Sequence, residues 1–299
     1  MLTRFVLTSR LVRWGASGDN DAMDLSFFNP GPGDSLTPND LARSLWSERQ
    51  MHGVAVSGAL ARAAERAVAA QGRTDLRPAR WNVDLFRPAE MVPCQTRTRI
   101  VRTSPRLCLV DVELVQDDIV RTRATALFLK PSEPAPGDVW EPTDHPAPPP
   151  ADIAPVSDEP RVPVFGSDGV WSGSFADHQN AARHMTWQTG VPVISGEAPT
   201  PFVAVASIAD ATSMVTNWGS NGVEQINTDI TLVLARQPIS LEIGLLATDR
   251  VSADGIAVGS AVVFDRQGRL GTSMTSSMAN AKRTVDFEVH DFADDPRAV

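Results

Sequence analysis

The sequence predicts an α+β protein made of two similar halves, each with one helix followed by an antiparallel meander of strands. An apolar segment with helical spacing occurs twice, and each copy precedes short alternating segments that are separated by turn residues. The chain has 299 residues, of which 42% are hydrophobic, so it can form one large domain or two units of about 150 residues.

The first half contains an Ala-rich segment at residues 53–71 that ends before Gly72. Its apolar residues recur every three or four positions, which predicts a helix. Alternating apolar and polar residues then predict four strands, the last two of which are joined by a turn at Asp117-Asp118. The expected strands span residues 80–87, 95–102, 107–115 and 119–129.

The second half repeats this order. Residues 201–218 form an apolar helical segment that ends at Gly219. Four strands are expected after it, and the last two are joined by a turn at residues 265–268. The expected strands span residues 226–236, 239–249, 255–264 and 269–278.

The spacing of these landmarks indicates a duplication. His52 lies 35 residues before Arg87, and Pro201 lies 35 residues before Arg236. An offset of 149 residues therefore superimposes the two halves.

A segment rich in proline and acidic residues separates the halves. Proline interrupts helices and ladders, so this segment is expected to cross the surface as an extended linker. The predicted organisation is an N-terminal domain at residues 1–130, a Pro-rich linker at 131–165 and a C-terminal domain at 166–299.

In each half, the strands of the meander form an antiparallel sheet, and the long helix is expected to lie against one face of it. Only the face that the helix covers is then shielded from water. This arrangement is the hot-dog fold. Two copies predict a double hot-dog fold, with two antiparallel sheets that are each wrapped around a long helix. The sheets are expected to continue edge to edge, which leaves fewer ladder groups unpaired.

Composition excludes several classes of function. The 27 Lys and Arg residues face 36 Asp and Glu residues, and a net charge of −9 disfavours nucleic acid as a partner. Two cysteines, no zinc motif and no phosphate-binding motif predict neither a disulfide framework nor a metal or cofactor. Residues 1–10 lack the apolar run of a secretory signal, and no stretch reaches 18 apolar residues. We therefore expect a cytoplasmic protein without a membrane partner.

Asp210 is the leading candidate for a functional residue, because it interrupts an apolar helical segment in which burial of a carboxylate is costly. Either its carboxylate faces water at the helix surface or is satisfied by a nearby hydroxyl, or it has a functional role. At the offset of 149, the neighbouring polar candidates also match apolar or small residues of the first half, so one site per chain is expected. The counterparts of Asp210, Asn227, Thr228 and Thr275 are Ala61, Pro78, Ala79 and Ala126.

Three further residues have two interpretations each. Asp229 either joins Asp210 as a polar partner or caps the loop that enters the strand. Arg236 either pairs with acids at a strand edge or contacts the anionic part of a ligand. His52 lies at a helix start, where a packing or hydrogen-bonding role is favoured over a general base. All three are candidate substrate-binding residues.

The chain resembles the acyl-CoA thioesterase II-like double hot-dog proteins over nearly its whole length. The resemblance rests on His52-Gly53 at the start of the Ala-rich helix and on the helix that contains Asp210. It rests also on the motifs VDLFRP at 83–88, GE at 196–197, PTP at 199–201 and INTDITL at 226–232, on Arg236 and Pro238, and on the turn at 265–271.

The resemblance implies that an Asp on the second helix, a Thr on the next strand and a Gln on the last strand hold a water that attacks a thioester. Asp210 matches the Asp, and the Thr position falls on Asn227 or Thr228, of which Asn227 is favoured. The Gln is absent, and Thr275 or Ser276 stands near its place.

Two functions remain open on this evidence. The first is hydrolysis of fatty acyl-CoA to free acid and CoA by an Asp-oriented water, which would be a hydrolase reaction of lipid metabolism. The alternative is a non-catalytic acyl-CoA or lipid-binding protein, which loss of the Gln favours. A monomer and a homodimer are both compatible with either function.

Overall fold

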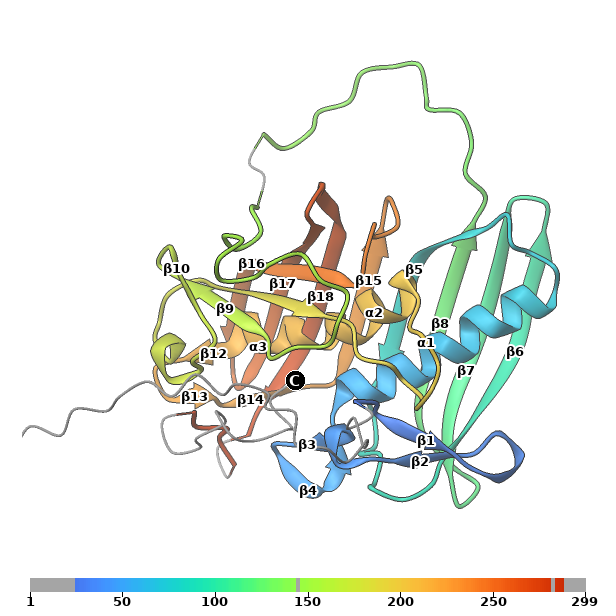
Figure 1. Cartoon of the computed structure of the whole chain (residues 1–299), viewed down its shortest axis with the longest axis horizontal. Coiled ribbons are helices and arrows are strands. Elements are labelled where there is room, and N and C mark those ends of the chain that lie inside the picture. The colour runs from blue at the N-terminus through green and yellow to red at the C-terminus, as the bar shows by residue number, and fades with distance from the viewer. Residues whose placement is uncertain (1–24, 144–145, 281–282, 288–299) are drawn as a thin grey trace, which may run out of the picture.

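The structure is a computed structural model that describes residues 25–143, 146–280 and 283–287. The segment at residues 1–10, in which no secretory signal is predicted, lies outside these ranges. Most of the described elements are strands, and they are accompanied by a small number of helices (Figure 1).

The first half forms as predicted, with small shifts at the ends of its strands. The long helix α1 (Gly53–Ala70) precedes β5 (Arg77–Asp84), β6 (Gln95–Ser104), β7 (Leu107–Gln116) and β8 (Ile119–Leu129). Asp117 and Asp118 both have positive φ, 49° and 59°, as a tight two-residue hairpin turn requires.

The second helix differs from the prediction. A single helix was expected over 201–218, but α2 (Pro201–Ile208) and α3 (Thr212–Asn217) are separated by the 3₁₀ turn η4 (Ala209–Ala211). The interruption lies beside side chains that are bound to the sheet, since the Thr212 hydroxyl donates to Ser273 Oγ at 2.7 Å. Tertiary contacts override local helix propensity at this point.

The first strand of the second half is also interrupted. The predicted strand at 226–236 is split into β14 (Gln225–Asn227) and β15 (Asp229–Leu234). Both Thr228 and Asp229 face Ser276, since Thr228 N donates to the Ser276 carbonyl and Ser276 N donates to Asp229 Oδ1. This irregularity resembles a β-bulge, which redirects the side chains around it. The remaining strands are β16 (Glu242–Ala253), β17 (Ile256–Asp265) and β18 (Gly268–Ala279).

Several short elements were not predicted, because they have too few residues to show a period and depend on tertiary partners. They are the strands β1 (Phe28–Pro30), β2 (Leu36–Pro38), β3 (Arg43–Ser44), β4 (Ser47–Met51), β9 (Val164–Ser167), β10 (Val170–Ser172), β11 (His184–Thr189), β12 (Trp218–Gly219) and β13 (Gly222–Val223), and the turns η1 (Pro32–Asp34), η2 (Asp40–Ala42) and η3 (Ala176–His178).

One continuous sheet of 12 strands runs through both halves in the order β10-β9-β11-β16-β17-β18-β15-β5-β8-β7-β6, with β14 paired to β18. Strands β5 and β15 pair antiparallel and join the halves, as the expected edge-to-edge continuation requires. Asn82 lies opposite Thr231 in this pair, and these two residues are 149 positions apart. The helices lie against the sheet (Figure 1).

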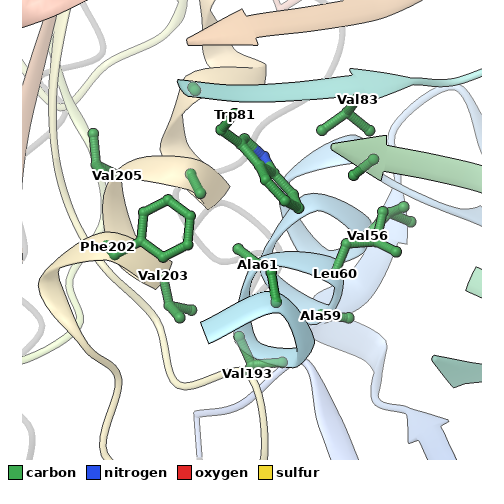
Figure 2. Close-up of a cluster of buried hydrophobic side chains, with 14 of the residues drawn as sticks. Val56, Ala59, Leu60, Ala61, Trp81, Val83, Val193, Phe202, Val203 and Val205 are labelled. Atoms are coloured by element: carbon green, nitrogen blue, oxygen red, sulfur yellow. The ribbon is translucent and has the colours of Figure 1, made fainter. Parts of the chain in front are cut away.

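The helices of the two halves also meet at positions that are 149 residues apart. The Ser57 hydroxyl donates to the Ala206 carbonyl at 2.6 Å and accepts from Trp81 Nε1 at 2.9 Å. A Cβ on Gly58 would lie 2.3 Å from Ser207 Oγ, so a larger residue at this position would require the Ser207 side chain to move. Apolar side chains surround the crossing, as Figure 2 shows for Trp81 beside α1 and α2.

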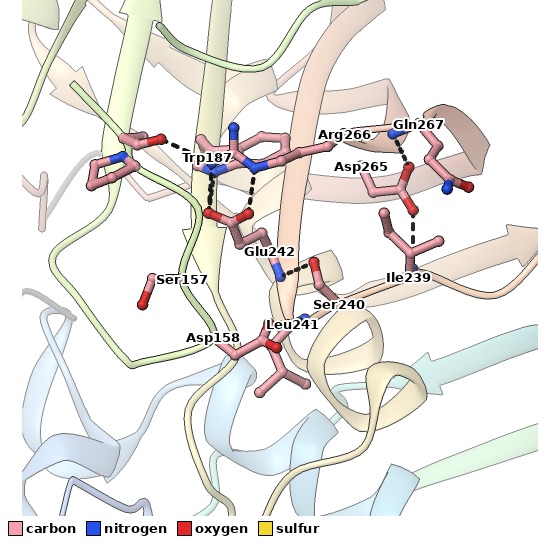
Figure 3. A network of polar contacts seen from close by, with 12 residues as sticks. Ser157, Asp158, Trp187, Ile239, Ser240, Leu241, Glu242, Asp265, Arg266 and Gln267 are labelled. Atoms are coloured by element: carbon pink, nitrogen blue, oxygen red, sulfur yellow. Dashed lines mark hydrogen bonds and ion pairs between the residues drawn. The ribbon is translucent and has the colours of Figure 1, made fainter. Parts of the chain in front are cut away.

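The described residues between Leu129 and Val164 lie outside helices and strands, in the segment that arches away from the sheet in Figure 1. The end of this segment packs on the second half. Asp158 Oδ1 accepts from Leu241 N at 2.8 Å, and Arg161 pairs with the buried carboxylate of Glu242. Figure 3 shows Glu242 held by Arg266 and Trp187.

We expect Ser57→Ala to lower the free energy of unfolding by about 1–3 kcal/mol, because it leaves the buried indole N–H of Trp81 without its acceptor and removes the hydrogen bond to the Ala206 carbonyl. Urea unfolding measures this difference. Trp81→Phe removes the same N–H, so Ser57→Ala should cost less in that background; an equal cost in both backgrounds would contradict this account.

Candidate active site

The carboxylate of Asp210 lies against the N-terminus of α1, which belongs to the other half of the molecule. Val54 N donates to this carboxylate, and Asn227 Nδ2 donates to Oδ1 at 2.9 Å. A Cβ on Gly53 would lie 2.1 Å from Oδ1, so the carboxylate rests directly on the backbone of the first helical turn. A side chain at position 53 would displace it.

Burial raises the pKa of Asp210 to about 6, while the hydrogen bonds from Asn227 and Val54 act in the opposite direction. The N-terminus of a helix also favours a negative charge. The carboxyl therefore titrates close to neutral pH, which suits a group that accepts a proton from water.

His52 caps α1. Its Nδ1 accepts from Ala55 N at 3.0 Å, which leaves Nε2–H to donate to the Leu41 carbonyl at 2.8 Å. Burial lowers the pKa of His52 to about 4, and the ring is neutral at pH 7. Both ring nitrogens are occupied, so the hydrogen-bonding interpretation of His52 agrees with the structure.

The two candidates on the second-half strand have different partners. Asn227 binds Asp210, whereas the Thr228 hydroxyl donates to the Ser276 carbonyl at 3.1 Å. The side chains of Asn227 and Thr228 point in different directions at the break between β14 and β15. Asn227 is thus the strand residue that contacts the carboxylate.

On the last strand, Thr275 faces the helices together with Ser273 and Ser277, which bind Thr212 and Asn217. Thr275 is buried, and its hydroxyl has no hydrogen-bond partner among the described residues. Side chains alternate along a strand, so Ser276 points to the opposite face. Of these two candidates, only Thr275 shares the face of Asn227.

Asp229 and Arg236 have structural partners and lie outside the pocket that Asp210 lines. Asp229 Oδ1 accepts from Ser276 N at 2.6 Å. Arg236 pairs with the fully buried carboxylate of Asp265. This carboxylate also accepts hydrogen bonds from Gln267 N and Ile239 N, as Figure 3 shows. These contacts correspond to the structural interpretations of both residues.

A pocket of about 190 Å³ opens beside Asp210. Besides Asp210, the polar residues that line it are His52, Asn227, Ser213, Gln225, Gln188, Ser44 and Arg43. Its other walls are apolar and aromatic, and most of them come from short strands and loops, where no sequence period marks them. They include Phe165, Phe175, Met214, Val223, Val285 and Phe287.

Within the described ranges, no three His, Cys, Asp or Glu side chains are grouped as metal ligands would be. No described helix has the length and apolar character that a membrane span needs.

The titration of His52 predicts a loss of stability in acid. The unfolded chain, with a pKa of about 6.5, takes up the proton before the folded one does. The contribution of neutral His52 to the free energy of unfolding is therefore fully present above pH 6.5. About 2 to 3 kcal/mol of this free energy is lost as the pH falls toward 4.

Urea unfolding of the parent and of His52→Asn at pH 7 and pH 4.5 tests this prediction. The variant keeps a capping acceptor but does not titrate. The free energy of unfolding should fall more steeply for the parent than for this variant. An equal fall in the free energy of unfolding of both proteins would show that His52 is not the titrating group.

Comparison with known proteins agrees with the fold. Residues 42–129 match the model of the acyl-CoA thioesterase N-terminal domain, and no curated protein matches the chain. The acyl-CoA thioesterase II TesB2 of Mycobacterium marinum aligns with a TM-score of 0.57 at 15% identity, covering 77% of this chain and 89% of that one.

Two further solved structures are similar. A hot-dog protein from Alicyclobacillus acidocaldarius aligns with a TM-score of 0.60 at 17% identity, over 86% of this chain and 97% of that one. A thioesterase II candidate from Thermobifida fusca aligns with a TM-score of 0.59 at 16% identity, over 82% and 92%. The chain therefore has a hot-dog fold, and its residues 42–129 resemble the acyl-CoA thioesterase N-terminal domain.

Proposed function

We propose that the protein hydrolyses the thioester bond of an acyl-CoA to a free acid and CoA. One observation supports this most directly. A carboxylate with a pKa near 6, held by Asn227 and by Val54 N, stands at the polar side of a pocket whose other walls are apolar. A thioester has the same division into a reactive polar group and an apolar chain.

In the proposed reaction, ionised Asp210 accepts a proton from a water while the water oxygen attacks the thioester carbonyl carbon. The resulting tetrahedral intermediate collapses, and the C–S bond breaks. The proton on Asp210 passes to the departing sulfur, which restores the carboxylate and releases the free acid and CoA. Asn227 keeps the carboxylate oriented throughout.

The second candidate function is binding of an acyl-CoA without hydrolysis. The supporting observation is that the Thr275 hydroxyl bonds to neither Asp210 nor Asn227. A water held by fewer groups is less well positioned, and a misplacement of about 1 Å can cost about a hundredfold in rate.

We also propose that the halves are two hot-dog units of one double hot-dog chain, with domains at residues 1–130 and 166–299 and a linker at 131–165. Contacts between positions that are 149 residues apart, at the helix crossing and in the central strand pair, support this proposal. The chemistry suggests a cytoplasmic place in lipid metabolism, and nothing in the site requires a second copy of the chain.

Asp210→Asn should lower the rate of thiol release from acyl-CoA by about a hundredfold or more, because it removes the proton acceptor. A panel of acyl-CoAs from acetyl to palmitoyl, followed by a thiol reagent, measures this effect and the preferred chain length. Asp118→Asn makes the same change at an exposed turn and should leave the rate unchanged.

The result also separates the two candidate functions. Parental release that Asp210→Asn abolishes supports hydrolysis. An absence of release from every substrate, together with a rise in melting temperature on addition of acyl-CoA, supports binding alone.

The pKa of Asp210 predicts the pH profile. The ionised form is the active base, so kcat/KM should rise with pH and level off above about pH 6. Asn227→Ala removes a hydrogen bond that favours the charged form, so it should move this inflection to higher pH. An inflection that is the same in both proteins would indicate another titrating group.

A further inference from the structure

Gln225 lines the same pocket as Asp210 and Asn227. It occupies β14 two residues before Asn227, so both side chains are on the same face of the strand. Gln225 also borders an adjoining cavity whose walls include Arg250 and Asn217.

The orientation of the Gln225 amide follows from its partner. Arg250 Nη2 lies 2.9 Å from Gln225 Oε1. A guanidinium group has donors only, so it must bind the amide oxygen rather than the nitrogen. Arg250 is held in turn by Asn217 Oδ1 at 3.3 Å and Ser252 Oγ at 3.2 Å.

The amide nitrogen of Gln225 is therefore an oriented donor whose hydrogen atoms bind no residue in the described part of the chain. The two other side-chain amides that line the pocket already have acceptors, since Asn227 Nδ2 donates to the Asp210 carboxylate and Gln188 Nε2 donates to Thr186 Oγ1. Thr275 does not line the pocket. A thioester carbonyl that gains negative charge needs donors that are in place before the reaction.

We propose that Gln225 is a further catalytic residue, whose Nε2 donates a hydrogen bond to the carbonyl oxygen of the bound thioester, and that Arg250 positions it. This inference rests on the proposed hydrolysis. As the carbonyl oxygen becomes an oxyanion in the tetrahedral intermediate, this hydrogen bond strengthens, and removal of such a donor costs about 10²–10³ in kcat.

Gln225→Glu is the decisive variant. It preserves the size of the side chain and gives Arg250 a charged partner, so the melting temperature should stay equal or rise, but it replaces the donor with a negative acceptor. We expect kcat/KM for the best acyl-CoA of the panel to fall about a hundredfold or more. Gln95→Glu, an exposed residue of β6, is the matched control and should retain the parental value.

Two more variants keep the test informative if Gln225→Glu does not fold. Gln225→Met removes the donor without adding charge, and it should lower kcat by about a hundredfold while KM changes little. Arg250→Met leaves the donor in place but frees the amide to rotate, and it should lower kcat by about tenfold.

The outcomes distinguish this inference from the proposed function. If thiol release depends on Asp210 but folded Gln225→Glu and Gln225→Met both retain the parental kcat/KM, the role of Gln225 is wrong and the hydrolysis stands. If the parent shows no Asp210-dependent release with any substrate of the panel, the hydrolysis and the role of Gln225 both fail.

Discussion

The contact between the Asp210 carboxylate and the N-terminus of α1 is the interaction on which the rest of the site depends. The carboxylate comes from the second half, while the backbone of Gly53 and Val54 comes from the first. The site therefore exists only where the β5–β15 pair and the helix crossing bring the halves together. Burial at this junction gives an ordinary aspartate a pKa near neutral pH.

The two halves contribute different chemistry to this junction. The first half supplies backbone N–H groups and a neutral histidine cap, both of which are features of a helix terminus. The second half supplies side chains, including Asn227 and the Arg250–Gln225 pair. Its helix is interrupted at η4, and Asp210 lies in this turn between two apolar residues. The pocket beside Asp210 thus combines backbone groups of the first half with side chains of the second.

The buried charges elsewhere hold the second half together. Glu242 and Asp265 are fully buried, and each is neutralised by arginine: Arg161 and Arg266 bind the first, and Arg236 binds the second. A buried carboxylate without such a partner would be costly. These pairs occupy arginines that could otherwise face a ligand, which explains why Arg236 is absent from the pocket.

The sequence by itself determined the helix at 53–70, the meander of each half and the prominence of Asp210, because these depend on local periodicity and on the cost of a carboxylate among apolar residues. Only the tertiary structure decided between Asn227 and Thr228, since a single irregular position in a strand reverses the direction of a side chain. It likewise decided the partner of Arg236 and the exposure of Gln225 to the pocket, because both depend on residues that are distant in the chain.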